Sequence, residues 1–480
     1  MNVLMKYLNF AAILAGATLP LAFAPFGYYW VAELSLVLLL FTWFKASPRL
    51  AFWYGWLFGA VFFSGGVYWV YISIHDFGHA PVILAAAILS LLIAFMALYP
   101  AVQGYLLQKI CHKNSWYKFL LVFPVSLVTL EWIRGWFLSG FPWLFLGYGH
   151  IDSPLRGFAP IFGVYGVSFF IAETAGVIFY MFYERKNKKL FIVLALFIVL
   201  IWSVGANLAK INWAKQAGEE ITVSLIQGNI SQERKWDPKE LQPILNSYLS
   251  LTAENFKSKI IIWPEAAIPT YPEYIWLQLK ALSTAAKKHK VAILSGAPLY
   301  DKKDGGVYNG IIALGAGSGQ YYKRQLLPFG EYLPLKFALK WLRHFLVIPM
   351  SGFSWGSKNQ PDLLAGGILI APFVCYEIAY PGLLLDYLPR AELLLTVCDD
   401  SWFGESIALH QHLEIARMRS LEVGRYQLLS TNTGISAVID EKGKVTAVAP
   451  MFQQAVLSAK VKSFTGSTPW VRFGRWLYPS

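Results

Sequence analysis

Long apolar stretches in the first 210 residues constrain the fold of this chain more than any other feature. A run of about 20 mainly apolar residues is long enough to cross a bilayer as a helix. Seven stretches approach or exceed this length and predict a polytopic α-helical membrane domain over residues 1–210. They cover residues 7–24, 28–45, 51–73, 81–108, 117–137, 158–183 and 190–209.

The composition of the whole chain also indicates a membrane protein. Of its 480 residues, 56% are hydrophobic and 14% are charged, and the mean hydropathy is +0.46. Globular domains carry about 25% charged residues. The net charge of +13 comes in part from cations in the loops between the apolar stretches, so it does not call for a nucleic-acid partner.

The positions of these cations predict the orientation in the membrane. They lie at the N-terminus and in every second loop, whereas the loops near residues 26, 77 and 145 carry almost none. By the positive-inside rule, the N-terminus is cytoplasmic. An odd number of spans then puts the residues after about 210 on the opposite face, which in a bacterium is the periplasmic face of the inner membrane. The first stretch has no evident cleavage site after it, so we interpret it as a span and not as a signal peptide.

Two further features of this half of the chain can be read from the sequence. Glu131 and Arg134 are three residues apart, so they share a helix face and are expected to form a pair inside the membrane. The aromatic- and glycine-rich loop 137–151 is expected on the periplasmic side, where it could either guide lipid or simply anchor the domain.

After residue 210 the pattern changes to that of an α/β domain. Short β-branched runs alternate with amphipathic helical patterns, which is typical of layered α/β architecture. Helices are expected at residues 241–257, 274–289 and 407–423. Strands are expected at residues 221–227, 259–263, 291–295, 309–315, 367–373, 393–397 and 426–439.

Cys375 follows one of these expected strands directly. The carboxyl ends of strands border the crevice in which open α/β sheets bind ligands, so the thiol is a candidate nucleophile. Cysteine is also among the most buried residue types, and most buried thiols are inert. The thiol alone therefore leaves both interpretations open.

Two further charged side chains follow expected strands. Glu265 ends Trp263-Pro264-Glu265, and Lys323 follows two tyrosines. A buried carboxylate with a raised pKa can take a proton from a thiol, and a lysine can stabilise an oxyanion. Charged residues at strand ends are more often simply solvated, so each position is ambiguous when considered by itself.

In this order, Glu265, Lys323 and Cys375 resemble the Glu-Lys-Cys triad of the nitrilase, or carbon-nitrogen hydrolase, superfamily. The separations of 58 and 52 residues fit one such domain. A nitrilase-like domain behind a polytopic membrane region is similar to the apolipoprotein N-acyltransferase family. Further similar stretches are Glu131 to Trp136, Gly140 to Leu144, Gln227 to Ile230, Lys235 to Pro238, Asp400 to Gly404 and Thr431 to Gly434.

The resemblance implies a fold and a reaction. The fold would be an αββα sandwich over residues 218–465, followed by a tail at 466–480. In the reaction, Cys375 would take an acyl chain from a phospholipid, most simply from the sn-1 ester of phosphatidylethanolamine, as a thioester. The α-amino group of the diacylglyceryl-cysteine of an apolipoprotein would then accept it, without cofactor or metal. This is covalent, ping-pong catalysis.

The resemblance also implies supporting roles for neighbouring residues. Glu331 would support the base and the lysine, and Tyr376 and Glu377 would shape the pocket. The backbone N–H of Tyr376 would bind the oxyanion together with Lys323. Trp236 and the loop 329–335 would contact the acyl chain or the headgroup.

Two departures from the family pattern stand out. Members usually carry a last span after the nitrilase domain, and no apolar stretch follows Trp476 here. Cys398-Asp399-Asp400 stands where a small polar residue and Asn usually precede the Asp. Because a disulfide between Cys398 and Cys375 would block the nucleophile, we expect Cys398 to be free and buried.

Two rival functions remain open at this point. A membrane-tethered amidase or nitrilase-type hydrolase would use the same three residues with water as the acceptor. A receptor or transporter-associated module would have no need of Cys375. His410 and His412 are two residues apart and cannot share a helix face, so a metal site is not expected there.

Overall fold

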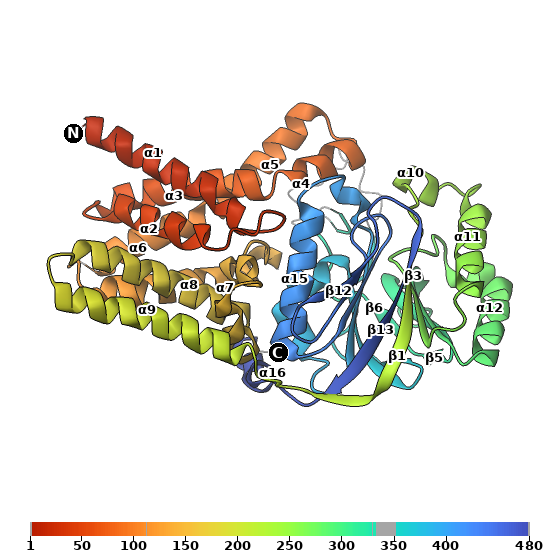
Figure 1. Ribbon diagram of the computed structural model, residues 1–480. Coiled ribbons are helices and arrows are strands. Elements are labelled where there is room, and N and C mark those ends of the chain that lie inside the picture. Colours follow the sequence, from red (N-terminus) through yellow and green to blue (C-terminus); the bar gives the residue numbers. More distant parts are fainter. Residues whose placement is uncertain (1, 112, 329, 333–351, 479–480) are drawn as a thin grey trace. The chain divides into compact units, whose positions relative to one another are not determined.

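The computed structural model describes residues 2–111, 113–328, 330–332 and 352–478, which form two compact units. The first unit reaches from the N-terminus to Asp76 and continues over Ala80–Ile211, and the second contains Phe77–His79 and the chain from Asn212 onward. Figure 1 shows that the first unit is helical and that the second is built of sheets and helices.

The first unit contains a series of α-helices. They are α1 (Asn2–Thr18), α2 (Val31–Trp43), α3 (Pro48–Gly66), α4 (Trp69–Ile72), α5 (Val82–Met96), α6 (Leu98–Ile110), α7 (Phe123–Arg134), α8 (Ala159–Tyr183) and α9 (Lys188–Leu208). Each apolar stretch identified in the sequence overlaps at least one of these helices. The helical, membrane-type character of this region is as expected.

The expected number of about seven spans is not confirmed. Within the described residues, four helical segments are long and apolar enough to cross a membrane: Met5–Ala22, Val82–Ile110, Pro154–Tyr183 and Lys188–Leu208. A fifth would be Pro48–Gly66 with Trp69–Phe77, a pair bent by 55°. Helix α2 has 13 residues. That length corresponds to about 20 Å, which is less than a hydrocarbon core of about 30 Å.

Small residues let two of these helices approach closely. A Cβ atom added at Gly55 of α3 would lie 2.3 Å from the Pro100 backbone oxygen of α6, and one at Gly59 would lie 2.8 Å from the Ala97 Cα atom. Both distances are shorter than a van der Waals contact. Because apolar burial does not drive helix association in lipid, such close packing is what stabilises helix pairs there.

Glu131 and Arg134, at the end of α7, both hold the following loop. The Leu146 amide donates to Glu131 at 2.8 Å, and Arg134 donates to the carbonyls of Trp143 at 2.6 Å and Leu144 at 3.2 Å. The two side chains therefore share one side of the helix, as expected, but each directs hydrogen bonds to the loop backbone.

The loop 137–151 itself is divided between buried and exposed aromatic side chains. Trp143, Phe145 and Tyr148 are buried within the first unit, whereas Phe137 is exposed. Only the start of this loop therefore exposes an aromatic side chain that could guide lipid or anchor the domain. The later aromatics are part of the packing of this unit.

The second unit contains two mixed sheets. Among the described residues, the first sheet has the order β13-β1-β2-β3-β4-β6 and the second the order β12-β11-β10-β9-β8-β7-β5. The strands are β1 (Lys215–Gln227), β2 (Ile260–Trp263), β3 (Ala292–Tyr300), β4 (Val307–Gly315), β5 (Gly317–Ser318), β6 (Gln320–Tyr322), β7 (Leu363–Ala365), β8 (Ile368–Val374), β9 (Leu393–Cys398), β10 (Gln427–Thr431), β11 (Ala437–Ile439), β12 (Val445–Val448) and β13 (Ala455–Thr465).

Parallel strands form the centre of each sheet. In the first sheet β1, β2 and β3 are parallel neighbours, and in the second β8, β9 and β10 are. The strand expected at 426–439 is two antiparallel strands, β10 and β11, joined by residues 432–436. Strand β13, which the sequence analysis missed, pairs antiparallel with β1.

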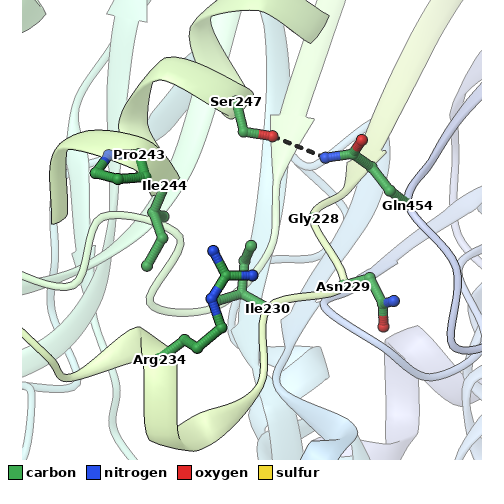
Figure 2. Close-up of a pocket in the computed structure, with 8 residues that line it drawn as sticks. All are labelled: Gly228, Asn229, Ile230, Arg234, Pro243, Ile244, Ser247 and Gln454. Atoms are coloured by element: carbon green, nitrogen blue, oxygen red, sulfur yellow. Dashed lines mark hydrogen bonds between the residues drawn. The ribbon is translucent and has the colours of Figure 1, made fainter. Parts of the chain in front are cut away.

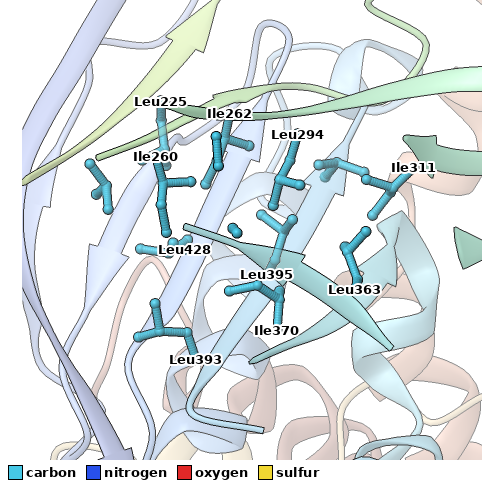
Figure 3. Packing of buried hydrophobic residues seen from close by; sticks show 14 of the residues in the cluster. Leu225, Ile260, Ile262, Leu294, Ile311, Leu363, Ile370, Leu393, Leu395 and Leu428 are labelled. Carbon is cyan, nitrogen blue, oxygen red and sulfur yellow. The ribbon is translucent and has the colours of Figure 1, made fainter. Parts of the chain in front are cut away.

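The two sheets face each other across the main hydrophobic core. Leucine, isoleucine and valine side chains from both sheets fill this layer, among them Ile262 and Leu294 from the first and Ile370 and Leu395 from the second (Figure 3). These strands are buried on both faces, which explains their continuous apolar sequences.

Helices cover the outer faces of the two sheets. Helices α11 (Leu241–Ala253) and α12 (Trp276–Lys288) bury Tyr248 and Leu279 against the first sheet. Helix α15 (Ala408–Val423) packs against β10 and β11 of the second (Figure 1). The expected αββα layering is therefore observed.

The chain after β13 stays attached to this unit. Helix α16 (Pro469–Phe473) begins after Thr468, whose hydroxyl donates to the Glu422 carbonyl at 2.7 Å and accepts from the Val471 amide. Arg475 then donates to the carbonyls of Leu385 at 2.9 Å and Leu388 at 2.8 Å.

Candidate active site

Three of the expected site residues follow directly on strand ends. Glu265 lies just past β2 and Lys323 follows β6, both in the first sheet, and Cys375 follows β8 in the second. The Glu265 and Lys323 side chains are buried, and Cys375 is partly exposed. The two sheets of the sandwich therefore each contribute to one cluster.

Hydrogen bonds join Glu265, Lys323 and Glu331 into one network. The Lys323 ammonium lies 4.0 Å from Glu265 Oε1 and 2.8 Å from Glu331 Oε2. The Asn309 amide donates to Glu265 Oε1 at 2.7 Å and to Glu331 Oε1 at 2.8 Å. One ammonium and one amide thus hold two carboxylates side by side.

Burial and neighbouring charges shift the pKa values of Glu265 and Lys323. It raises the pKa of Glu265 from 4.5 to about 6, against the opposing effect of Lys323. Burial lowers the pKa of Lys323, but the charges of Glu331 and Glu265 outweigh this and raise it above its ordinary value. Near neutral pH, Lys323 is therefore charged and Glu265 is suited to exchange a proton.

Cys375 has a strained backbone. Its φ of +54° lies in the left-handed region, which is costly for a residue with a Cβ atom. The strain turns the chain sharply from β8 into the helical turn Cys375–Ala379. As a result, the thiol lies at the end of the sheet, in the first residue of this turn.

The charges of the network act on this thiol. The Cys398 thiol lowers the pKa of Cys375, but burial and the carboxylate of Glu265 raise it, and the net pKa lies above the ordinary value. Cys375 is therefore a protonated thiol near neutral pH, and it needs a base to become a nucleophile.

Glu377 anchors the turn that follows Cys375. Its carboxylate accepts from the Val374 amide at 2.8 Å, the Arg324 amide at 2.6 Å and the Tyr321 hydroxyl at 2.8 Å. These donors come from both sides of the cluster, so Glu377 ties the Cys375 segment to the Lys323 segment. Tyr376 is also buried and makes an edge contact with Tyr380, at 5.2 Å between ring centroids.

The comparisons with known proteins cover both units. The chain matches the family model of the apolipoprotein N-acyltransferase N-terminal domain over residues 15–177 and that of carbon-nitrogen hydrolases over residues 222–469. The apolipoprotein N-acyltransferase of Coxiella burnetii is 45% identical over 96% of this chain and 95% of its own length. The chain belongs to the apolipoprotein N-acyltransferase family.

A second relative gives the same assignment. The apolipoprotein N-acyltransferase of Methylococcus capsulatus is 41% identical over 97% of this chain and 92% of its own length. The resemblance inferred from the sequence is therefore confirmed. Like the other members of this family, the chain is a membrane protein and an enzyme with a carbon-nitrogen hydrolase domain.

Two solved structures align with about half of this chain. Nit3 of Saccharomyces cerevisiae aligns with 55% of this chain and 96% of its own, at 17% identity and a TM-score of 0.38. The NitFhit protein of C. elegans aligns at 16% identity and a TM-score of 0.40, over 55% of this chain and 65% of its own.

Cys398, where the sequence departs from the usual family pattern, lies beside the candidate nucleophile. The sulfur atoms of Cys375 and Cys398 and a carboxylate oxygen of Asp400 lie within 4.8 Å of one another. Both cysteines are free, and Cys398 is buried, as expected. Burial raises the pKa of the Cys398 thiol well above its ordinary value.

Asp399, in the same stretch, stands where the family usually has Asn, and it forms a buried ion pair with Lys235 of the short helix α10 (Gln232–Lys235). The Asp399 backbone amide donates to Glu265 Oε2 at 2.8 Å. The Asn432 side-chain amide donates to Asp399 Oδ1 at 3.1 Å. This ion pair therefore connects α10 to the Glu265 carboxylate.

Sequence reasoning missed two members of this site, Asn309 and Lys235. Asn309 is a buried polar residue within a β-branched strand, and strands are depleted in asparagine. An asparagine within a β-branched strand pattern could therefore have pointed to Asn309 as a candidate site residue. Lys235 lies in one of the stretches that resemble the apolipoprotein N-acyltransferase family, but nothing in the sequence indicates that it pairs with Asp399.

Other expected contacts are only partly supported. Trp236 directly follows Lys235, but its side chain is exposed and 38% accessible, whereas Lys235 is the buried one. Of the expected contact loop 329–335, residues 329 and 333–335 lie outside the described residues. Glu331, within this loop, is buried in the cluster.

A separate pocket of about 280 Å³ opens in the same unit (Figure 2). It is lined by Gly228, Asn229, Ile230, Arg234, Pro243, Ile244, Ser247 and Gln454. None of the three candidate catalytic side chains lines it. Two of the lining residues are joined by a hydrogen bond of 2.7 Å that Gln454 donates to Ser247.

Proposed function

We propose that this enzyme transfers an acyl chain from a phospholipid to the α-amino group of the diacylglyceryl-cysteine of apolipoproteins. The observation that carries this proposal is the match to curated relatives of that name, which extends over both units and not over the hydrolase domain alone. The expected phospholipid donor is phosphatidylethanolamine, through its sn-1 ester.

In the first half-reaction, Glu265 accepts the proton of the Cys375 thiol. The sulfur attacks the carbonyl carbon of the donor ester, and the carbonyl oxygen becomes an oxyanion. Lys323 and the backbone N–H of Tyr376 stabilise this oxyanion. The ester bond to glycerol then breaks, Glu265 returns the proton to the leaving alkoxide, and lysophospholipid departs from a thioester on Cys375.

In the second half-reaction, the α-amino group of the acceptor attacks the thioester. Glu265 takes a proton from this nitrogen, and the same two donors stabilise the new oxyanion. The carbon–sulfur bond breaks, an amide is released, and the Cys375 thiol regains its proton. A pKa of about 6 for Glu265 suits a group that both accepts and returns a proton.

Supporting roles follow from the contacts. Glu331 holds Lys323 at 2.8 Å and shares the Asn309 amide with Glu265, so it positions both groups. Glu377 and Tyr376 shape the turn that carries the thiol. The exposed indole of Trp236 is proposed to contact an acyl chain or a headgroup.

The membrane unit fits these lipid substrates. We propose a multi-pass protein of the bacterial inner membrane, with about seven spans, a cytoplasmic N-terminus and a periplasmic catalytic domain over residues 218–465. The asymmetry of loop cations supports the orientation. In this topology the domain would work on the outer leaflet, where both substrates are anchored.

The alternative is a membrane-tethered hydrolase of the amidase or nitrilase type. It would form the same thioester on Cys375 but release the acyl group to water. The identity of the acceptor therefore separates the two functions, and the two can be distinguished in one assay.

The test uses the full chain in detergent with phosphatidylethanolamine labelled in its sn-1 chain. Acid quenching should trap label on the protein as a hydroxylamine-sensitive thioester, and Cys375→Ala should carry none. The matched control is Cys111→Ala, which removes a thiol of the other unit and should keep the label.

Addition of a diacylglyceryl-cysteine peptide should then move the label to the peptide as a hydroxylamine-resistant amide. Label that remains bound to Cys375→Ala would contradict the mechanism. Release of labelled free fatty acid with no labelled peptide would identify the hydrolase instead.

A further inference from the structure

The thiols of Cys375 and Cys398 and the carboxylate of Asp400 form a compact set of metal ligands. Their three ligand atoms lie within 4.8 Å of one another. Thiolate and carboxylate are both ligands of Zn²⁺, and two thiolates favour soft divalent cations such as Cd²⁺ as well. We infer that this cluster binds one soft divalent cation, and that the bound cation inhibits acyl transfer.

The distances are compatible with a tetrahedral site. With a metal–sulfur bond of about 2.3 Å and a metal–oxygen bond of about 2.0 Å, ligand atoms lie about 3.3–3.8 Å apart. The observed limit of 4.8 Å exceeds this by about 1 Å, so small side-chain rotations close the site. Three protein ligands leave the fourth position for water.

The surroundings fix two of the three ligands. Cys398 and Asp400 are buried, on β9 and in the turn that follows it. The His412 ring lies 3.2 Å from Asp400 Oδ1 through Nδ1 and 3.9 Å from the Cys398 sulfur. Such a histidine beside a liganding carboxylate orients it for the metal. Cys375, the third ligand, is partly exposed and gives a cation its route of entry.

Inhibition follows from what the cation would occupy. Binding displaces one proton from each thiol and commits a sulfur lone pair of Cys375 to the metal, so this sulfur is no longer free to attack an ester. This part rests on the proposed role of Cys375 as nucleophile. The binding itself does not, because it is measured without any substrate.

The test uses the full chain in detergent, reduced and treated with chelator. Equilibrium dialysis should find one Zn²⁺ per chain, and Cd²⁺ should produce thiolate-to-metal charge-transfer absorption. Loss of an orienting neighbour costs a metal site about 10- to 100-fold in affinity, so Cys398→Ser, which removes a ligand, should cost at least about tenfold. Cys375→Ala should weaken Zn²⁺ binding to a similar extent.

Cys111→Ser is the matched control and should bind Zn²⁺ as the unmodified chain does. Asp400→Asn tests the third ligand without removing a thiol, and it should also weaken binding. Equal affinity in the unmodified chain and in Cys398→Ser would overturn the site, and so would loss of binding in Cys111→Ser.

Inhibition is measured separately, as the decrease in thioester formation relative to each variant's own metal-free rate. Zn²⁺ should inhibit the unmodified chain reversibly, with recovery after chelation, and Cys398→Ser should need at least about tenfold more Zn²⁺. Equal inhibition of both would overturn the inhibitory role. If no thioester forms even without metal, the proposed function fails while the dialysis result for the metal site stands.

Discussion

The side-chain amide of Asn309 donates a hydrogen bond of 2.7 Å to the Glu265 carboxylate. This bond stabilises the ionised form of Glu265 and lowers its pKa, against the larger effect of burial. Asn309, near the start of β4, thus acts on the candidate base through this hydrogen bond.

Replacement of Asn309 by Ala should shift the pH profile of acylation. Loss of the hydrogen bond raises the pKa of Glu265 further, so the acid limb of thioester formation should move to higher pH. The measurement is the rate of thioester formation from labelled phospholipid as a function of pH. Asn246→Ala, on the exposed face of α11, is the control and should keep the original profile. An unshifted acid limb in Asn309→Ala would show that the amide has no influence on the base.

The unmodified chain should itself lose activity below about pH 6. Burial raises the pKa of Glu265 to about 6, and only the ionised carboxylate can accept the thiol proton. Thioester formation should therefore rise with pH through about 6 and then level off, because Lys323 stays charged. Glu265→Gln cannot accept a proton and should be slower by about 10²- to 10⁴-fold. The exposed Glu254→Gln serves as control. If Glu265→Gln retained the rate and the acid limb, another group would have to be the base.

Lys323→Gln should slow both half-reactions. Removing one oxyanion donor costs about 10²- to 10³-fold. The substitution also removes a charge that lowers the pKa of Glu265, so the remaining activity should have its acid limb at higher pH. Single-turnover assays of acylation and of transfer to the peptide would measure the two effects. Lys280→Gln, on the exposed side of α12, should change neither. A variant impaired only in transfer would argue against one shared oxyanion site.

The positions of the candidate catalytic residues at strand ends could be predicted because that signal is local, but only the resemblance to the Glu-Lys-Cys triad singled these three residues out. Each of Glu265, Lys323 and Cys375 follows a short run of apolar or aromatic residues, and the end of a strand can be read from a few neighbouring residues. The layered architecture was predictable for the same reason, since buried parallel strands have continuous apolar sequences.

What the sequence missed depends on contacts between distant segments. Strand β13 pairs with β1, more than 200 residues earlier, and Lys235 meets Asp399 across 164 residues. The split of the expected strand 426–439 has another cause. Apart from Ile435, residues 432–436 are polar or small. They are nevertheless buried, with hydrogen bonds from Asn432 to Asp399 and from Ser436 to Gln227.

Glu377→Gln should destabilise the catalytic domain and impair Cys375. The carboxylate accepts hydrogen bonds from backbone amides on two segments, and a glutamine would turn its NH₂ group toward some of these donors. Each buried group left unsatisfied costs about 1–3 kcal/mol. Thermal unfolding followed by circular dichroism should show the loss, and thioester formation should fall with it. The exposed Glu254→Gln should leave both unchanged, and equal stability of the two variants would contradict an anchoring role for Glu377.

A double-mutant cycle can measure how strongly the buried ion pair between Lys235 and Asp399 stabilises the protein. Because Asp399 raises the pKa of Glu265 while Lys235 neutralises Asp399, each single replacement should disturb both stability and the base. Lys235→Met leaves a buried carboxylate without its counter-charge, which should cost about 3–5 kcal/mol. It should also move the acid limb of thioester formation to higher pH if Asp399 stays ionised.

Asp399→Asn should move that acid limb the other way, because it removes a negative charge near Glu265 while the Asp399 backbone amide still donates to the carboxylate. The double variant Lys235→Met/Asp399→Asn removes both charges, so its loss of stability should be smaller than the sum of the two single losses. Chemical unfolding of all four chains measures the coupling, and the pH profile of thioester formation measures the effect on Glu265. Additive losses in the double variant would mean that the two side chains do not stabilise each other, which would contradict a stabilising role for the ion pair.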